Sequence, residues 1–183
     1  GHPAIAITDH GVCHDFPAAY SAAKKAGIQM IFGVEAYFVN DVDDMPAVRG
    51  DLDAGFHGEY VCFDLETTGL DARKDVIIEI GAVVYRDGKV TDEVFSTFVD
   101  PGRPIPYEVS QLTGITGDMV KGAPGQAEAL RQFLDFIHGR PLAAHNAGFD
   151  VGFLSEGCRR MGLSLGATAV DTLPLAQALL PNL

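Results

Sequence analysis

Residues 59–99 restrict the fold more than any other stretch, because three strand-like segments follow one another with short connections. Residues 60–66 and 75–86 are rich in apolar and β-branched side chains, and Asp87-Gly88 separates the second segment from a third at 89–99. An Asp-Gly pair between two such segments is typical of a two-residue hairpin turn. We therefore expect three hairpin-connected strands.

After these strands, helix-like and strand-like segments alternate. Residues 125–138 carry apolar side chains at helical spacing and are followed by Gly139, which predicts a helix. The other expected elements are short helical pieces at 108–112 and 117–121, a strand at 141–145, and helices at 149–161 and 172–180. The hydrophobic content of 47% is that of a core-forming globular chain. The pattern predicts an α/β fold in which helices pack on a mixed sheet.

Residues 1–39 resemble a separate βαβ-like unit. An apolar strand at 4–8 ends in the polar sequence Thr8-Asp9-His10-Gly11, a helix is expected over 16–26, and a second strand at 28–39 carries Glu35. Such a unit is too small to fold alone. The next residues, 40–58, contain five aspartates and predict a solvated linker before a domain at 59–183.

The charge balance limits the partners of the chain. It has 13 Lys and Arg against 25 Asp and Glu, a net charge of −12, which excludes a general basic surface for phosphate backbones. The cysteines Cys13, Cys62 and Cys158 form no CxxC pair, so a disulfide framework is not expected and a reducing cytoplasmic location is. No apolar run approaches the ~20 residues of a membrane helix, and no membrane partner is expected.

The first chemical motif is the sequence Phe63-Asp64-Leu65-Glu66. Residues i and i+2 of a strand share a face, so Asp64 and Glu66 present two carboxylates together. Such a pair repels unless a cation or a proton compensates it, and Mg²⁺ or Mn²⁺ favours carboxylate oxygen. The alternative is a solvent-facing strand with two surface acids.

The second motif is His145-Asn146-Ala147-Gly148-Phe149-Asp150. It places a strand end, a turn and the first turn of a helix in succession. Asp150 also suits a helix N-terminus on electrostatic grounds, and His145 also suits a hydrogen-bonded structural role. Taken alone, this motif does not separate these alternatives.

Together, the D-x-E-T-T-G motif, the sequence L-T-G-I-T at 112–116 and the second motif resemble the DEDD exonucleases, over residues 59–183. The resemblance implies a ribonuclease-H-like mixed sheet and 3′→5′ exonuclease activity. It also implies that the carboxylates of Asp64, Glu66 and Asp150 are catalytic and hold two divalent metal ions, Mg²⁺ or Mn²⁺. Water would attack the terminal phosphodiester.

The resemblance also implies substrate contacts. The candidates for contact with the terminal nucleotide are Thr67, Thr68, Gly69, Leu112, Ile115 and Asn146. For Gly69 and for Gly114, simple turn geometry is an equal alternative.

One family motif is not found in this sequence. The histidine subclass has a general-base histidine five residues before a fourth metal-binding aspartate, and no histidine follows His145 here. Asp171, directly before a helix, instead suits an N-cap. We therefore expect the chain to stop before the last helix of the domain and to be nearly inactive by itself.

The N-terminal unit resembles part of the polymerase and histidinol phosphatase (PHP) domain. The resemblance implies that His10 and Glu35 are metal ligands and that Asp9 orients its neighbour. A PHP segment before a DEDD exonuclease resembles a family of bacterial replicative DNA polymerases. We thus expect a proofreading exonuclease segment whose partners are single-stranded or frayed DNA 3′ ends and, through the rest of the polymerase, replisome components. The alternatives are an exoribonuclease acting on short RNA and a non-catalytic docking module.

Overall fold

The computed structural model describes residues 1–36, 47–52, 55 and 57–180. The chain divides into two compact units, Gly1–Asp44 and Met45–Leu183. The larger unit carries the carboxylate motifs.

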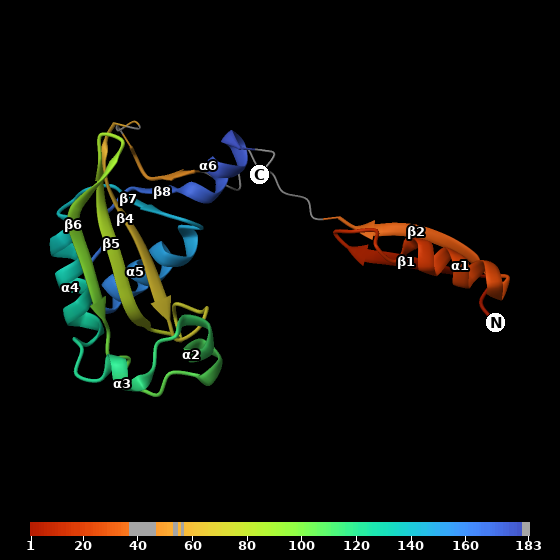
Figure 1. The fold of residues 1–183 in the computed structure, drawn as a ribbon, viewed down its shortest axis with the longest axis horizontal. Coiled ribbons are helices and arrows are strands. Elements are labelled where there is room, and N and C mark those ends of the chain that lie inside the picture. The colour runs from red at the N-terminus through yellow and green to blue at the C-terminus, as the bar shows by residue number, and fades with distance from the viewer. Residues whose placement is uncertain (37–46, 53–54, 56, 181–183) are drawn as a thin grey trace. The chain divides into compact units, whose positions relative to one another are not determined.

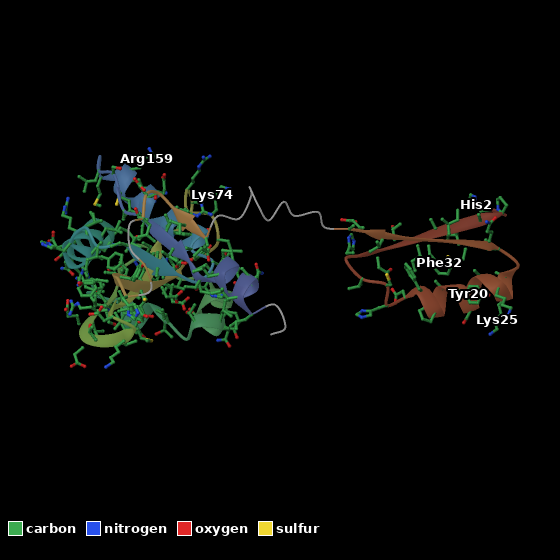
Figure 2. The ribbon with its side chains drawn as sticks, turned by 90° about the horizontal axis from the view of Figure 1, so that it is seen from above. His2, Tyr20, Lys25, Phe32, Lys74 and Arg159 are labelled. Carbon is green, nitrogen blue, oxygen red and sulfur yellow. The ribbon has the colours of Figure 1, made fainter. Side chains whose placement is uncertain are left out.

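Over residues 1–36, the small unit has two parallel strands and one helix: β1 (Ala4–His10), α1 (Phe16–Ala26) and β2 (Gln29–Glu35). The expected βαβ arrangement is confirmed, and α1 ends at Gly27, whose φ of 63° is left-handed. Tyr20 of α1 lies over Phe32 of β2, with ring centroids 6.4 Å apart (Figure 2). Among the described residues of this unit, Ala23 is the single buried apolar side chain, so the unit has little core of its own.

The large unit is built on a six-stranded mixed sheet (Figure 1). The long strands β4, β5 and β6 are antiparallel neighbours, β7 and β8 run parallel to β4, and β3 is antiparallel to β8. In sheet order the strands are β3 (Val48–Arg49), β8 (Ala169–Asp171), β7 (Leu142–Ala144), β4 (Glu59–Thr67), β5 (Ile77–Arg86) and β6 (Lys89–Phe98). The three hairpin-connected strands are confirmed, and Asp87 and Gly88 form the turn with φ values of 51° and 80°.

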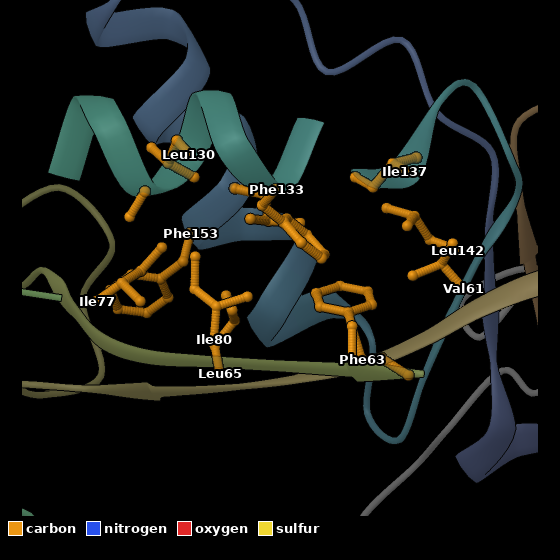
Figure 3. Close-up of a cluster of buried hydrophobic side chains, with 14 of the residues drawn as sticks. Val61, Phe63, Leu65, Ile77, Ile80, Leu130, Phe133, Ile137, Leu142 and Phe153 are labelled. Atoms are coloured by element: carbon orange, nitrogen blue, oxygen red, sulfur yellow. The ribbon is translucent and has the colours of Figure 1, made fainter. Parts of the chain in front are cut away.

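Within the described part of the large unit, five helices accompany the sheet. They are α2 (Tyr107–Thr113), α3 (Gly117–Val120), α4 (Gln126–Ile137), α5 (Gly148–Arg160) and α6 (Thr172–Leu179). Side chains from α4 and α5 pack against one face of the sheet, where Phe133 is fully buried and its ring lies 5.6 Å from that of Phe63 (Figure 3). Of the helices that the structure describes, none has both the length and the apolar character required to cross a lipid bilayer.

Strand β4 separates the core from the acidic motif. Val61, Phe63 and Leu65 are buried and point toward the helices (Figure 3). Because strand side chains alternate, Asp64 and Glu66 face the other side of the sheet. Burial of the odd-numbered side chains therefore determines where the carboxylates are presented.

At the start of β4, an ion-pair network links four segments of the large unit. Glu59 accepts hydrogen bonds from Arg86 of β5 and from Arg140, which follows α4. The same two arginines pair with Glu93 of β6, at 2.8 and 3.0 Å. Hydrogen bonding to Arg86, and then to Arg140, lowers the pKa of Glu59 to about 2.

Two short strands were not expected from the sequence. Val48 and Arg49 pair with Val170 and Ala169 of β8, although they lie in the segment expected to be a linker, 40–58. The hydroxyl of Thr168 also donates to the Asp51 carbonyl at 2.9 Å. This part of the expected linker is therefore attached to the sheet, while residues 40–46, 53–54 and 56, and the end of the strand expected at 28–39, lie outside the described residues.

Candidate active site

Asp64 and Glu66 lie near the carboxyl end of β4. Asp64 is exposed to solvent and Glu66 is half-buried. The pairing register places Glu79 of β5 directly opposite Glu66. Directly opposite residues of an antiparallel pair share a face, so a third carboxylate lies beside the motif.

Asp150 completes the acidic group from a distant part of the chain. It lies in the first turn of α5 and is 3% exposed. Its Oδ1 accepts a hydrogen bond of 3.1 Å from the backbone N–H of Leu65, the residue between Asp64 and Glu66. Strand β7 pairs with β4 only at Val61 and Cys62, so this buried N–H lacks a partner from β7 and the Asp150 carboxylate satisfies it. The structure thus places Asp150 beside the strand segment that bears Asp64 and Glu66, as the sequence predicts.

Burial and neighbouring negative charge raise the pKa of two of these carboxylates, Asp150 and Glu66. Burial, followed by the charge of Asp64, raises the pKa of Asp150 from 3.8 to about 6, although the bond from Leu65 opposes the shift. Burial, followed by the charges of Asp64 and Glu79, also raises the pKa of Glu66. Across the part of the chain that the structure describes, no Lys, Arg or His forms an ion pair with any of these four carboxylates. The site thus carries uncompensated negative charge.

This donor set has the chemistry of a divalent-cation site. Carboxylate oxygens are the ligands that Mg²⁺ and Mn²⁺ prefer, and a cation would relieve the mutual repulsion of the acids. Within the described ranges, however, no three His, Cys, Asp or Glu side chains are grouped closely enough to hold a metal ion. The residues fit a divalent ion in kind and charge, while their side chains are not arranged as a complete ligand set.

The turn after β4 uses its polar groups internally. The Thr67 hydroxyl donates to the Gly69 carbonyl at 2.6 Å, and Thr68 is 3% exposed. A Cβ atom on Gly69 would overlap the carboxylate of Asp75. Close packing therefore explains this glycine, and the hydroxyls of Thr67 and Thr68 have partners within the protein.

The two apolar candidates after β6 have different environments. Leu112 of α2 is 87% exposed, whereas Ile115 is 2% exposed and packs in a small cluster with Ile78 and Val120. Between them, Gly114 ends α2 with a φ of 76°. Of the two, Leu112 alone presents its side chain to solvent.

Asn146 and His145 occupy the turn between β7 and α5. Asn146 is exposed with a φ of 60°, and its N–H donates to Asp171 Oδ1 at 3.0 Å. The same oxygen accepts from the N–H of Leu173, so Asp171 is the N-cap of α6, as the sequence predicts. His145 is also exposed, and its Nδ1 lies 3.1 Å from the Thr172 hydroxyl. Asp171 thereby ties the turn to the start of α6.

In the small unit, His10 and Glu35 are brought together. They are register partners at the carboxyl ends of the parallel strands β1 and β2, and His10 Nδ1 lies 2.8 Å from Glu35 Oε2. The neighbouring Asp9 accepts a hydrogen bond from the N–H of Asp15 at 3.1 Å. The predicted pair is therefore adjacent and exposed.

Two carboxylates near a strand end, a third carboxylate from a helix distant in the sequence, and a mixed sheet with helices packed on it are together the features of an exonuclease domain. The chain belongs to the exonuclease family RNase_T, whose sequence profile matches residues 61–183. The fold of the large unit is similar to that of solved structures: exonuclease I superposes with a TM-score of 0.61 at 17% identity, over 69% of this chain and 32% of that protein. Exonuclease X in complex with 5′ overhanging duplex DNA gives a TM-score of 0.55 at 29% identity, over 68% of this chain and 66% of that one.

Along its whole length the chain is similar to DNA polymerase III PolC-type. It is 49% identical to the protein of Clostridium perfringens over 183 residues, which are 100% of this chain and 12% of that polymerase. The protein of Thermotoga petrophila is 45% identical over 183 residues, 98% of this chain and 13% of the polymerase. The chain thus spans about an eighth of the length of these relatives.

Proposed function

We propose that the large unit is the 3′→5′ proofreading exonuclease of a PolC-type replicative DNA polymerase, and that it hydrolyses the terminal phosphodiester of single-stranded or frayed DNA. The observation that carries the proposal is the hydrogen bond from Leu65 N–H to Asp150. It brings a carboxylate of α5 to the segment of β4 that bears Asp64 and Glu66. The similarity to PolC-type polymerases supports the DNA substrate and the replicative context.

Asp64, Glu66 and Asp150 would hold the metal ions. When bound, two divalent ions, Mg²⁺ or Mn²⁺, would supply the positive charge that activates water and stabilises the leaving 3′ oxygen. The chain itself contributes a buried carboxylate at Asp150, which a protein hydrogen bond orients. The exposed side chain of Leu112 offers an apolar surface for the terminal base.

For the small unit we propose that residues 1–39 are part of a PHP domain and that His10 and Glu35 are metal ligands there. The contact between their side chains, at the ends of two parallel strands, supports this assignment. Calorimetric titration of the complete protein with Mn²⁺ or Zn²⁺ tests it, and Glu35→Gln should remove one class of site while leaving the exonuclease unchanged.

The exonuclease proposal is tested in the protein that contains this chain. Asp64→Asn and Asp150→Asn are compared with Asp135→Asn, a control on the exposed face of α4. We expect both site variants to lose on the order of 100-fold or more in Mg²⁺-dependent removal of 3′ nucleotides from a 5′-labelled DNA oligonucleotide, with the control unchanged. An RNA oligonucleotide in the same assay distinguishes a DNA exonuclease from the exoribonuclease alternative. Unchanged DNA cleavage in both site variants would refute the proposal.

A further inference from the structure

We propose that Arg103 is a positioning residue for the substrate. It connects the loop at 68–76, after β4, to the segment at 101–106, which leads into α2. Arg103 thereby sets the distance between this loop and α2, the two surfaces that would receive the terminal nucleotide. The inference rests on the exonuclease function proposed above.

The loop at 68–76 is closed by its own hydrogen bonds. Thr68 N–H donates to the Val76 carbonyl at 2.9 Å, and Val76 N–H donates back to the Thr68 hydroxyl at 3.1 Å. The Asp75 carboxylate lies against Gly69 and accepts from Asp71 N–H at 3.0 Å. The loop carries Leu70, which is 87% exposed. These hydrogen bonds join the two ends of the loop and fix its shape.

Arg103 reaches this loop from outside it. Its Nη2 donates to the Thr68 hydroxyl at 2.9 Å and to the Lys74 carbonyl at 2.8 Å, and it lies 3.4 Å from Asp75 Oδ1. The Thr68 hydroxyl is buried and already has these partners, so it does not contact a substrate directly. Its contribution to binding would pass through the position of the loop.

The same arginine adjoins the second surface. Arg103 precedes Ile105, which packs against the cluster of Ile78 and Ile115, and α2 with the exposed Leu112 follows at once. Among the described residues, Arg103 makes every hydrogen bond between the loop at 68–76 and the segment at 101–106.

A second arginine holds the other side of the loop. Arg160, at the end of α5, donates to the carbonyls of Ala72 and Arg73 at 3.0 and 2.8 Å. The loop is thus anchored to α5 independently of Arg103. Removing Arg103 should therefore alter the spacing to α2 without releasing the loop.

The test compares Arg103→Ala and Thr68→Val with Thr68→Ser, which keeps the hydroxyl. Arg131→Ala, on the exposed face of α4, is the matched control. In the full protein we expect KM for a single-stranded DNA 3′ end to rise about tenfold in Arg103→Ala and Thr68→Val, with kcat within about twofold of the wild type. Thr68→Ser, which keeps the hydroxyl, should have the KM of the wild type.

Binding of the same oligonucleotide in EDTA, measured by fluorescence anisotropy, tests the role of Arg103 in the absence of cleavage. It should weaken about tenfold in Arg103→Ala and stay unchanged in Arg131→Ala. Unchanged binding and KM in Arg103→Ala, or an equal loss in Arg131→Ala, would overturn the role of Arg103. A wild-type protein that binds the oligonucleotide but never cleaves it would instead overturn the proposed exonuclease function.

Discussion

The Asp150→Asn variant should be more stable than the wild type at pH 8, because the native site destabilises its own charge. Burial and the charge of Asp64 raise the pKa of Asp150 from 3.8 to about 6. This difference corresponds to roughly 3 kcal/mol of unfolding free energy that the ionised wild type lacks at pH 8. The weaker bond that a neutral side chain accepts from Leu65 is already included in this difference, because that bond opposes the rise of the Asp150 pKa. We expect a gain of about 3 kcal/mol.

The sign of the pH dependence follows from the raised pKa. A carboxyl group whose folded pKa is raised contributes stability below its unfolded pKa of 3.8, and this contribution is lost as the pH rises through about 6. The gain of the variant should therefore be largest above pH 7 and shrink as the pH falls toward 4.

The assay is urea unfolding in EDTA followed by circular dichroism, because the chain contains no tryptophan. The wild type, Asp150→Asn and the surface control Asp135→Asn are compared at pH 8 and pH 4.5. Addition of Mg²⁺ at pH 8 should stabilise the wild type and leave Asp150→Asn nearly unchanged. A variant that is less stable than the wild type at pH 8, or a difference that does not vary with pH, would refute the electrostatic account.

Two further predictions concern stability. Gly152→Ala should stabilise α5 by about 1 kcal/mol, since the added Cβ atom would lie in open space. Gly157→Ala should not be stabilising, because the Cβ atom added there would overlap the buried Leu130. Chemical denaturation of the two variants side by side measures the difference. Glu59→Gln should lower the melting temperature slightly at pH 7 and have no effect near pH 2. Hydrogen bonding to Arg86, and to a second arginine, lowers the pKa of Glu59 from 4.5 to about 2. The stabilisation by the ionised Glu59 is therefore lost as the pH falls from 4.5 through about 2. Equal melting temperatures of variant and wild type at pH 7 would contradict this prediction.

The predicted elements with strong local patterns are confirmed. Helix α1 spans Phe16–Ala26 as expected, and the turn at Asp87 and Gly88 adopts the left-handed backbone that a two-residue hairpin needs. These features depend on neighbouring residues alone, such as a terminating glycine or a period of apolar side chains.

Strands β3 and β8 could not be predicted in this way. They have two and three residues, too few to show a period, and each pairs with a neighbour from elsewhere in the chain. For the same reason, a segment with linker-like composition contributes Val48 and Arg49 to the sheet.

That Asp64 and Glu66 share one face of a strand follows from their spacing in the chain, because the alternation of side chains is a property of the extended backbone. That Glu79 lies opposite Glu66 and that Asp150 accepts a hydrogen bond from Leu65 follows from how the chain folds in three dimensions. The same holds for the hydrogen bond from Arg103 to the Thr68 hydroxyl. These contacts depend on which strands become neighbours and where a strand leaves a backbone N–H unpaired, and no local pattern contains that information.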